Sequence, residues 1–373
     1  MFIEIEKKNL VSLLARAQNI VEKRNTMPVL ANVLLQVENK TLKIFATDLE
    51  VSITDEAPII KGAAGQLAAS AKNLFDIIKE FADGTILITK KENNWLEIKQ
   101  NKSVFNIVGI STDEYPIFPS FSTKDFMKVD PKVLSEMIEK TIYSVSSDET
   151  RYHLNGVYFE KYTFEGKESF KMVATDGHRL SLVSRQIDEK NSKNLVNQGV
   201  IIPRKGLFEI RKLLDEATGL VEMAIEGPQL IVRSNSTVLM TRLIEGKYPN
   251  YQMLIPQNLN RKVLVNREML LSSLKRVSLL SNQKYKGVTL SLSKGILEIS
   301  STNPDLGDAK EEIEIDYKGD EMKIGFNAKY ILDVLNSFDD ESVDINLNDQ
   351  ISPGLMRPHN DINYTCVVMP MRI

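Results

Sequence analysis

Acidic side chains follow strand-like segments of this chain, where they could bind a metal or take part in hydrolysis. Asp48 follows the apolar run KIFAT and Asp176 follows KMVAT, while a third such run, LEISST, is followed by Asn303. Asp48 and Asp176 could together hold a divalent metal, and Gly177-His178 could extend a hydrolytic site. A metal-dependent nuclease or phosphoesterase is therefore one class of protein that these residues allow.

A tight turn is the stronger interpretation of these acids. An Asp after a strand usually caps backbone N–H groups of a turn, and Asn303 can make the same turn although it is a poorer metal ligand. The histidines His153, His178 and His359 lack the spacing of metal ligands, and the sequence contains no Gly-rich phosphate loop and no HExxH or CxxC motif. We therefore expect no catalytic residue, no metal and no cofactor.

The three turns at Asp48, Asp176 and Asn303, each of which we call a corner, recur at nearly constant spacing, which indicates tandem domains. Aligning Ala46, Ala174 and Ser301 gives intervals of 128 and 127 residues. Each corner ends a hairpin, and each hairpin follows a helix whose apolar residues recur at i, i+3, i+4 and i+7. A second helix and further alternating strands come next in every copy. The sequence predicts an α+β fold of three tandem domains, each made of two strand–helix–three-strand repeats.

Two Pro-containing segments at equivalent places, Tyr115–Asp125 and Tyr248–Asn260, are expected to link the domains. We therefore expect domains at residues 1–122, 123–254 and 255–373. A length of 373 residues is enough for two or three domains that each bury a core.

The composition is that of a globular protein, with 42% hydrophobic and 26% charged residues. A single cysteine, Cys366, excludes an internal disulfide framework and fits a reducing compartment. The N-terminus carries charge before any apolar run, unlike a signal peptide. No window reaches the ~18 uninterrupted apolar residues of a membrane span. We expect a cytoplasmic protein without a membrane partner.

Basic residues are concentrated on the predicted helices. The six predicted helices have a net charge of +9, which leaves −12 for the rest of a chain whose formal net charge is −3. Lys72, Lys205 and Lys329 each lie near the start of a second helix, where a cation opposes the helix dipole. Three cations at one equivalent position favour a polyanion lying across these helices. Solvated helix faces and an ordinary DNA-binding protein with one basic face are the alternatives.

Four motifs together resemble one protein family: ATDGHRL at Ala174–Leu180, IPRKG at Ile202–Gly206, GKYPNY at Gly246–Tyr251 and VVMPMRI at Val367–Ile373. The whole chain is similar to the bacterial DNA polymerase III beta subunit, the family of replicative sliding clamps. The resemblance implies the DNA-clamp fold, with helices lining the channel of a ring and sheets outside. It also implies a non-enzymatic processivity factor, a head-to-tail homodimer that encircles duplex DNA and slides without sequence specificity.

The resemblance further implies two functional surfaces. The residues that should face DNA are Arg24, Lys72, Arg151, Tyr152, His153, Arg204, Lys205, Asn282 and Lys284. The residues that should form a hydrophobic pocket for clamp-binding peptides are Leu154, Thr175, Gly177, His178, Arg179, Leu180, Pro249, Leu254, Pro353, Val367, Met369, Pro370, Met371 and Arg372. This pocket should tether the DNA polymerase III catalytic subunit, the clamp loader and other proteins with a clamp-binding motif. The sequence departs from the family at Met253, where some relatives have arginine, and over Gln350–Asn363.

A half ring would leave one exposed sheet edge at each end, and bare edges tend to be paired. We expect the first edge at Ser103–Val108, with Phe105 as its apolar anchor. We expect the other at Ile296–Ser301, with Leu280 close by. Phe105 and Leu280 are therefore the expected dimer contacts.

Overall fold

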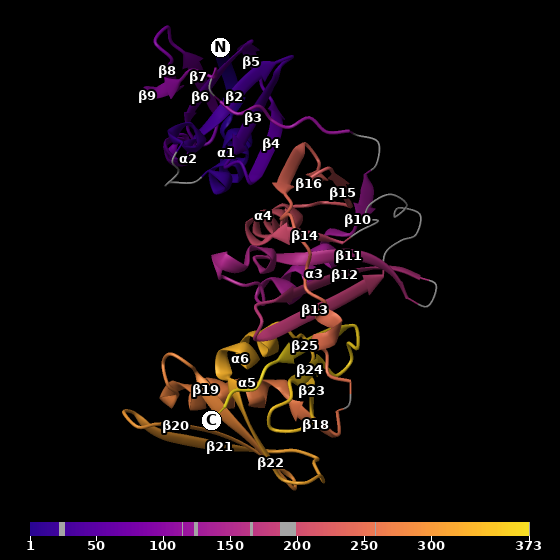
Figure 1. Ribbon diagram of the computed structural model, residues 1–373. Helices are drawn as coiled ribbons and strands as arrows, with labels where there is room; N and C mark the ends of the chain where they lie inside the picture. Colours follow the sequence, from indigo (N-terminus) through magenta and orange to yellow (C-terminus); the bar gives the residue numbers. More distant parts are fainter. Residues whose placement is uncertain are drawn as a thin grey trace. The chain divides into compact units, whose positions relative to one another are not determined.

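The computed structural model describes residues 1–21, 27–113, 115–122, 126–164, 167–186, 199–257 and 259–372 (Figure 1). These residues form two compact units. The first unit contains residues 1–132 and 205–243, and the second unit contains residues 133–186, 199–204 and 244–372.

A strand followed by a helix and three strands occurs six times along the described chain, as the sequence predicts. The first two repeats, with the additional short strand β5, are β1 (Phe2–Glu6), α1 (Lys7–Ile20), β2 (Asn32–Glu38), β3 (Thr41–Thr47), β4 (Val51–Pro58), β5 (Lys61–Ala63), β6 (Gly65–Ser70), α2 (Ala71–Glu80), β7 (Thr85–Lys90), β8 (Trp95–Gln100) and β9 (Ser103–Ile110). The next two are β10 (Met127–Val129), α3 (Pro131–Ile142), β11 (Gly156–Phe164), β12 (Lys167–Thr175), β13 (Arg179–Gln186), β14 (Val200–Pro203), α4 (Arg204–Asp215), β15 (Val221–Glu226), β16 (Gln229–Ser234) and β17 (Thr237–Arg242). The last two are β18 (Arg261–Asn266), α5 (Arg267–Val277), β19 (Gly287–Ser293), β20 (Ile296–Asn303), β21 (Gly307–Glu314), β22 (Met322–Asn327), α6 (Ala328–Asn336), β23 (Ser342–Leu347), β24 (Gly354–Pro358) and β25 (Tyr364–Val368). Short 3₁₀ helices are η1 (Pro28–Ala31), η2 (Glu149–Leu154), η4 (Tyr251–Leu254) and η5 (Ser278–Leu280).

Antiparallel pairing joins strands from distant repeats into large sheets. In the first unit, β17 pairs with β4 and completes a 13-stranded sheet. In the second unit, β13 pairs with β25 within an 8-stranded sheet, and β19 to β22 form a separate 4-stranded sheet in the order β21-β20-β19-β22. In both long-range pairs, β4 with β17 and β13 with β25, the first strand follows a corner and the second is the last strand of a later repeat.

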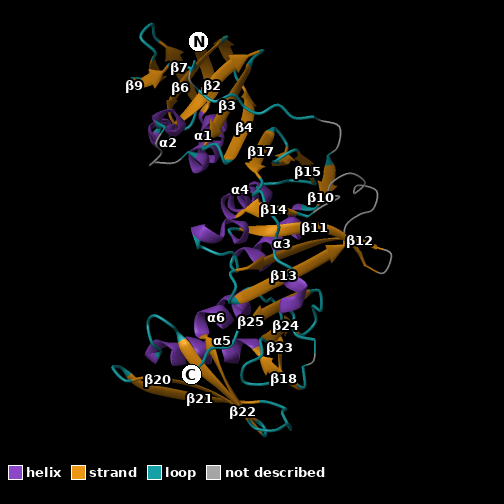
Figure 2. Cartoon of the chain, viewed as in Figure 1, coloured by secondary structure: helices purple, strands orange, loops and turns teal. Residues whose placement is uncertain are grey.

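Helices lie in pairs against the sheets, with α1 next to α2 and α5 next to α6 (Figure 2). The predicted apolar stripes face the core: Leu10, Leu13 and Leu14 are at most 1% exposed, and so are Leu274 and Val277. No helix among the described residues is both long enough and apolar enough to cross a membrane.

The three corners are the tight turns that the sequence predicts. Asp48 Oδ1 accepts hydrogen bonds from the backbone N–H groups two and three positions later, at 2.9 and 2.6 Å. Asp176 Oδ1 does the same at 2.9 and 3.0 Å. Asn303 Oδ1 accepts the N–H two positions later at 3.0 Å. The side chains therefore hold the chain as it turns from one strand into the next.

A buried polar network lies beneath the pairing of β13 with β25. The Tyr143 hydroxyl lies 3.0 Å from the Tyr364 hydroxyl and 3.2 Å from Cys366 Sγ, and it accepts a hydrogen bond from Ser181 Oγ at 2.7 Å. Burial raises the pKa of the Cys366 thiol, which keeps it protonated at neutral pH. These contacts satisfy polar groups that would otherwise be costly to bury.

Tyr115 and Tyr248, which begin the segments expected to link the domains, are only 6% and 7% exposed and pack on sheet faces. One sequence-based expectation is wrong. Ile296–Ser301 is not a sheet edge, because β20 pairs with β19 on one side and with β21 on the other. The alternation of polar and apolar residues resumes after the corner and produces β21, an edge strand rich in exposed charged residues.

The corner at Asp176 can be tested by substitution. Asp176→Ala removes the acceptor for two backbone N–H groups and the carboxylate that lies 3.1 Å from Arg179 Nε. We expect it to lower the free energy of unfolding by about 2–3 kcal/mol, measured by urea denaturation. Asp176→Asn keeps the acceptor, as Asn303 does, and should cost about half as much. Equal losses in the two variants would mean that the turn hydrogen bonds do not stabilise the corner.

Candidate peptide-binding site

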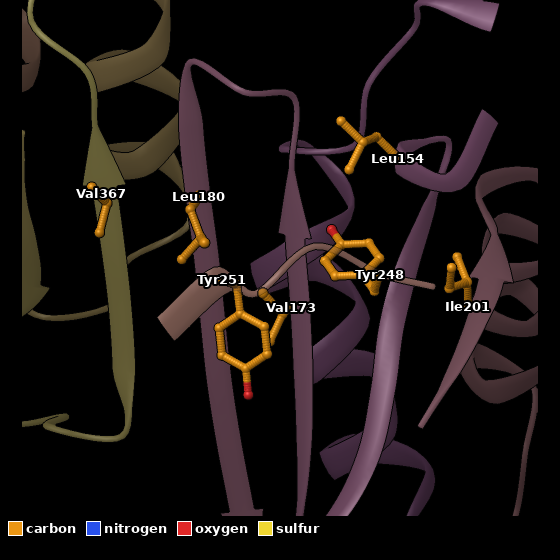
Figure 3. Close-up of a cluster of buried hydrophobic side chains, with 7 residues drawn as sticks. All are labelled: Leu154, Val173, Leu180, Ile201, Tyr248, Tyr251 and Val367. Atoms are coloured by element: carbon orange, nitrogen blue, oxygen red, sulfur yellow. The ribbon is translucent and has the colours of Figure 1, made fainter. Parts of the chain in front are cut away.

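Buried apolar side chains from distant parts of the second unit form one cluster across β12 and β13 (Figure 3). Its members, each at most 7% exposed, are Leu154, Val173, Leu180, Ile201, Tyr248, Tyr251 and Val367. Leu154, Leu180 and Val367 belong to the pocket expected from the sequence, and Leu254 packs against the cluster. The fold therefore brings four of the expected pocket residues together.

Two tyrosines of the segment 248–254 fasten it to the sheet. The Tyr248 hydroxyl accepts a hydrogen bond from the Thr175 N–H at 3.1 Å, and the Tyr251 hydroxyl donates to Glu160 Oε1 at 2.6 Å. The Tyr158 ring stacks on Tyr248 with centroids 5.1 Å apart. Burial raises the pKa of both phenols, and the neighbouring Glu160 raises that of Tyr251 further. Both hydroxyls therefore keep their protons at neutral pH.

The Asp176 corner lies beside the C-terminal run. Gly177 has a φ of +87°, a conformation that glycine adopts without the penalty of a side chain. Leu180 pairs with Val367 across β13 and β25, and the Met369 N–H donates to the His178 carbonyl oxygen at 2.8 Å. His178 is exposed, so the rim of the cluster combines a turn with exposed backbone and an imidazole.

Arg179 is buried and holds neighbouring elements rather than presenting a free charge. It is 7% exposed, and its Nη1 lies 2.5 Å from Asp333 Oδ2 on α6. Its guanidinium also lies 4.7 Å from the centre of the Tyr330 ring, on which His178 stacks at 6.3 Å. Arg179 therefore positions α6 against the corner.

The C-terminal run continues past the closed cluster to an open surface. The Met371 N–H donates to the Gly325 carbonyl oxygen of β22 at 2.8 Å. Pro370, Met371 and Arg372 line a hollow of about 600 Å³ together with Ile351, which is 82% exposed. The candidate site therefore has two parts, a buried cluster and an open hollow, which are connected by the C-terminal run from Val367 to Arg372.

The remaining pocket residues lie near these two parts. Pro353 precedes Gly354, which pairs with Val368, and Thr175 is buried at 3% exposure. Pro249 is half-buried. The segment Gln350–Asn363, poorly matched in sequence, contains the paired strand β24. Sequence reasoning missed Val173, Ile201, Tyr248, Tyr251 and Tyr330, although the shared Tyr-Pro at residues 115 and 248 was an available signal.

The expected DNA contacts lie on helix starts and turns. Lys72, Lys205 and Lys329 each occupy the second position of a helix, α2, α4 and α6 respectively. Lys205 forms an ion pair with Asp48. Arg204 begins α4 and is exposed, and Arg24 lies outside the described residues.

The other expected DNA contacts lie on η2 and on one exposed turn. Arg151, Tyr152 and His153 belong to η2, and Tyr152 is 57% exposed. Asn282 and Lys284 form an exposed turn in which Asn282 Oδ1 accepts the Lys284 N–H at 2.9 Å.

The expected dimer contacts lie on or near free sheet edges. Ser103–Val108 of β9 pairs only with β8 among the described residues, and Phe105 on this edge is 42% exposed. Leu280 is half-buried at the end of η5, and its neighbour Leu279, missed in the sequence, is 75% exposed.

The corner carboxylates are occupied by protein groups. Asp48 binds two backbone N–H groups and Lys205, while Asp176 binds two backbone N–H groups and Arg179. No group of three or more His, Cys, Asp or Glu residues suited to a metal occurs within the part of the chain that the structure describes. The geometry therefore assigns these acids to turns.

Paired repeats, a corner beside the C-terminal run and sheets shared between distant strands define a clamp fold of three domains. Sequence models of the N-terminal, central and C-terminal domains of the DNA polymerase III beta subunit match residues 1–119, 128–250 and 252–372. The chain belongs to the DNA polymerase III beta subunit family.

Full-length relatives agree with this assignment. Beta sliding clamps of Caulobacter vibrioides and Haemophilus influenzae are 32% and 33% identical, with 100% of each chain covered. A crystal structure of the beta sliding clamp of C. crescentus has a TM-score of 0.95 at 32% identity. A sliding clamp of Pseudomonas aeruginosa bound to griselimycin has a TM-score of 0.92 at 31% identity, and both structures cover 100% of both chains.

The role of Tyr248 in building the site can be measured. Tyr248→Phe keeps the ring but leaves the buried Thr175 N–H without its acceptor. We expect the free energy of unfolding to fall by about 1–3 kcal/mol in urea denaturation. Tyr251→Phe is the matched control, since Glu160 keeps its ion pair with Lys171 at 3.5 Å. The hypothesis fails if the control variant loses as much stability as Tyr248→Phe.

Proposed function

We propose that the protein is a processivity clamp whose two copies pair head to tail, enclose duplex DNA without reading its sequence and hold DNA enzymes through the peptide-binding site. The clamp itself performs no chemistry. Its partners are duplex DNA, the DNA polymerase III catalytic subunit, the clamp loader and other proteins with a clamp-binding motif. The three domains meet near residues 122 and 254, and the protein works in the cytoplasm, where bacterial DNA is replicated.

The pattern of strand pairing is the observation that carries this proposal. Inside the chain, the post-corner strands β4 and β13 pair with β17 and β25, each the last strand of a domain. The third post-corner strand, β21, lies at a sheet edge, and the last strand of the first domain, β9, has its Ser103–Val108 edge free among the described residues. Pairing β21 of one copy with β9 of the next repeats the same contact and covers both of these edges.

The internal pairs also predict the register of this contact. In β17 and β4, Leu239 pairs with Ile53. Phe105 is the third residue of β9 after its hairpin turn, as Leu239 is the third residue of β17. Ala309 of β21 pairs with Ser301 across its corner, as Ile53 of β4 pairs with the equivalent residue Ala46. Phe105 of one copy should therefore lie opposite Ala309 of the other.

The cations support a DNA-facing side of the clamp. Lys72 and Lys329 are exposed at the second position of α2 and α6, where they oppose the helix dipoles at a cost of a few tenths to about 1 kcal/mol each. Lys205 at the same position of α4 is paired with Asp48. Phosphates would offset this cost without contacting the bases, so binding should be independent of sequence and weaken with salt.

Enclosure of DNA can be tested with circular and linear templates. The protein is loaded onto nicked circular DNA with a clamp loader and ATP, and is then passed through a gel-filtration column in high salt. We expect it to remain on the circle and to be lost after the circle is linearised, because a ring slides off an open end. Equal loss from both forms would favour simple surface binding, and metal-dependent cleavage abolished by Asp176→Ala would favour a nuclease.

The register between copies can be tested with cysteine pairs. If Phe105 faces Ala309, then Asn106 faces Asp308, and opposite Cα atoms about 4.5–5.5 Å apart can support a disulfide. Asn106→Cys with Asp308→Cys should give a covalent dimer on mild oxidation, seen on a non-reducing gel. Asn106→Cys with Lys310→Cys is shifted by two residues and should cross-link poorly. Efficient cross-linking of the shifted pair alone would overturn the register.

A further inference from the structure

A hollow of about 310 Å³ lies on the first unit, on the face shared by β2, β3, β4 and β6. Leu34 pairs with Phe45 of β3 and with Ala68 of β6, so these side chains lie side by side on that face. Val33 and Leu35, on either side of Leu34 in β2, are fully buried on the other face. The segment 115–118 completes the lining.

This face is the repeat equivalent of the candidate peptide-binding site. Leu34 pairs with Phe45 and Ala68 as Tyr158 pairs with Val173 and Ile201 in the second unit. The segment that begins at Tyr115 crosses it as the segment from Tyr248 crosses the second face. The hollow is lined by residues of β2, β3 and β6 next to this segment. The resemblance to the family does not assign these residues to peptide binding.

The hollow is held open by a rigid segment. The Tyr115 hydroxyl donates to the carbonyl oxygens of Asn32 and Phe45 at 2.8 and 3.2 Å. The Phe45 ring meets Tyr115 and Phe118 edge-on, with centroids 5.6 and 5.2 Å apart. Closing the hollow would require these buried contacts to break, so it is preformed.

Side-chain size explains why the first unit has space here. Leu34 and Ala68 stand where the second unit has Tyr158 and Ile201, and the Tyr158 ring there stacks on the crossing segment. The smaller residues leave a volume at the lower end of the ~300–1,000 Å³ range of ligand pockets. That volume suits one large side chain and adjoining backbone.

The lining favours an anionic ligand. Lys43 is exposed and is the one charged residue of the lining among the described residues. It forms no salt bridge within the described ranges, although Glu56 lies opposite it in the register of β3 and β4. Gln36 and Gln66 add amide groups beside the aromatic wall. A ligand with a carboxylate next to an apolar group could pair its charge with Lys43 and pack its apolar group against the aromatic wall.

We propose that this hollow is a second peptide-binding site, which takes one large apolar side chain next to a carboxylate from a protein that acts on the same DNA. The proposal rests on the proposed function, because only a clamp that tethers partners has use for a second peptide site. A partner held at both places would gain avidity and a defined orientation.

Methyl NMR on isoleucine-labelled full-length protein tests this proposal. The probes are N-acetyl-Gly-Phe, with its free carboxylate, and N-acetyl-Gly-Phe-amide. Ile110 and Ile117 report on the hollow, while Ile201 and Ile244 report on the cluster of the candidate peptide-binding site. A peptide from the polymerase tail is the positive control for Ile201 and Ile244.

We expect the carboxylate probe to shift the Ile110 and Ile117 signals. Leu34→Tyr, which fills the hollow with the side chain of the second unit, should abolish these shifts. Lys43→Glu should lower the affinity for the carboxylate probe by about three- to tenfold and leave the affinity for the amide probe unchanged. Lys61→Glu on β5 is the matched charge control and should have no effect.

The two proposals fail separately in this experiment. If the polymerase peptide shifts Ile201 and Ile244 but neither probe shifts Ile110 or Ile117, the second site is wrong and the proposed function stands. If shifts at Ile117 persist in Leu34→Tyr, the contact is on the surface and the second site is also wrong. If the polymerase peptide gives no shift, the peptide-tethering function fails and the second site loses its basis.

Discussion

The demand that every strand find a neighbour organises this chain. Backbone groups at a sheet edge need partners, and here the strand after a corner and the last strand of a domain supply them to each other. This pairing also builds the candidate peptide-binding site, because the register of β13 with β25 sets Leu180 opposite Val367. A slip of one residue would turn every side chain of the strand to the other face and separate the members of the cluster.

Local patterns in the sequence predicted the repeats, the buried helix stripes and the turns at Asp48, Asp176 and Asn303, because each depends on residues a few positions apart. The contacts that close the site were not predictable in this way. Tyr248 bonds to Thr175 on β12, and Tyr251 bonds to Glu160 on β11. These partners are distant in the sequence, so only the folded sheet brings them together. The same limit explains why β21 was missed: its charged sequence resembles a loop until its partner β20 is known.

One turn motif serves three different surroundings. The acid at the first corner pairs with Lys205, while the second corner places Arg179 between Asp176 and Asp333 and so ties it to α6. Asn303 at the third corner is neutral and 7% exposed. The hydrogen bond from the side-chain oxygen to the N–H two positions later is thus shared, and the long-range partner of each corner makes the three domains unequal. The second corner contacts the C-terminal run through the His178 carbonyl oxygen, which accepts the Met369 N–H, and so contributes to the candidate peptide-binding site.

The edges of β9 and β21 that we propose to pair differ in charge, and this difference limits how the chain can assemble. β9 carries no charged residue, whereas β21 carries Asp308, Glu311, Glu312 and Glu314 against one cation, Lys310. Two β21 strands side by side would repel each other, so the edges favour unlike partners. A contact between unlike surfaces closes a ring only if its rotation brings the chain back to its start, and otherwise it grows into an open fibre. Whether the chain forms a two-membered ring or a polymer therefore depends on the angles at the junctions within each chain. A mutation far from either edge could convert one assembly into the other.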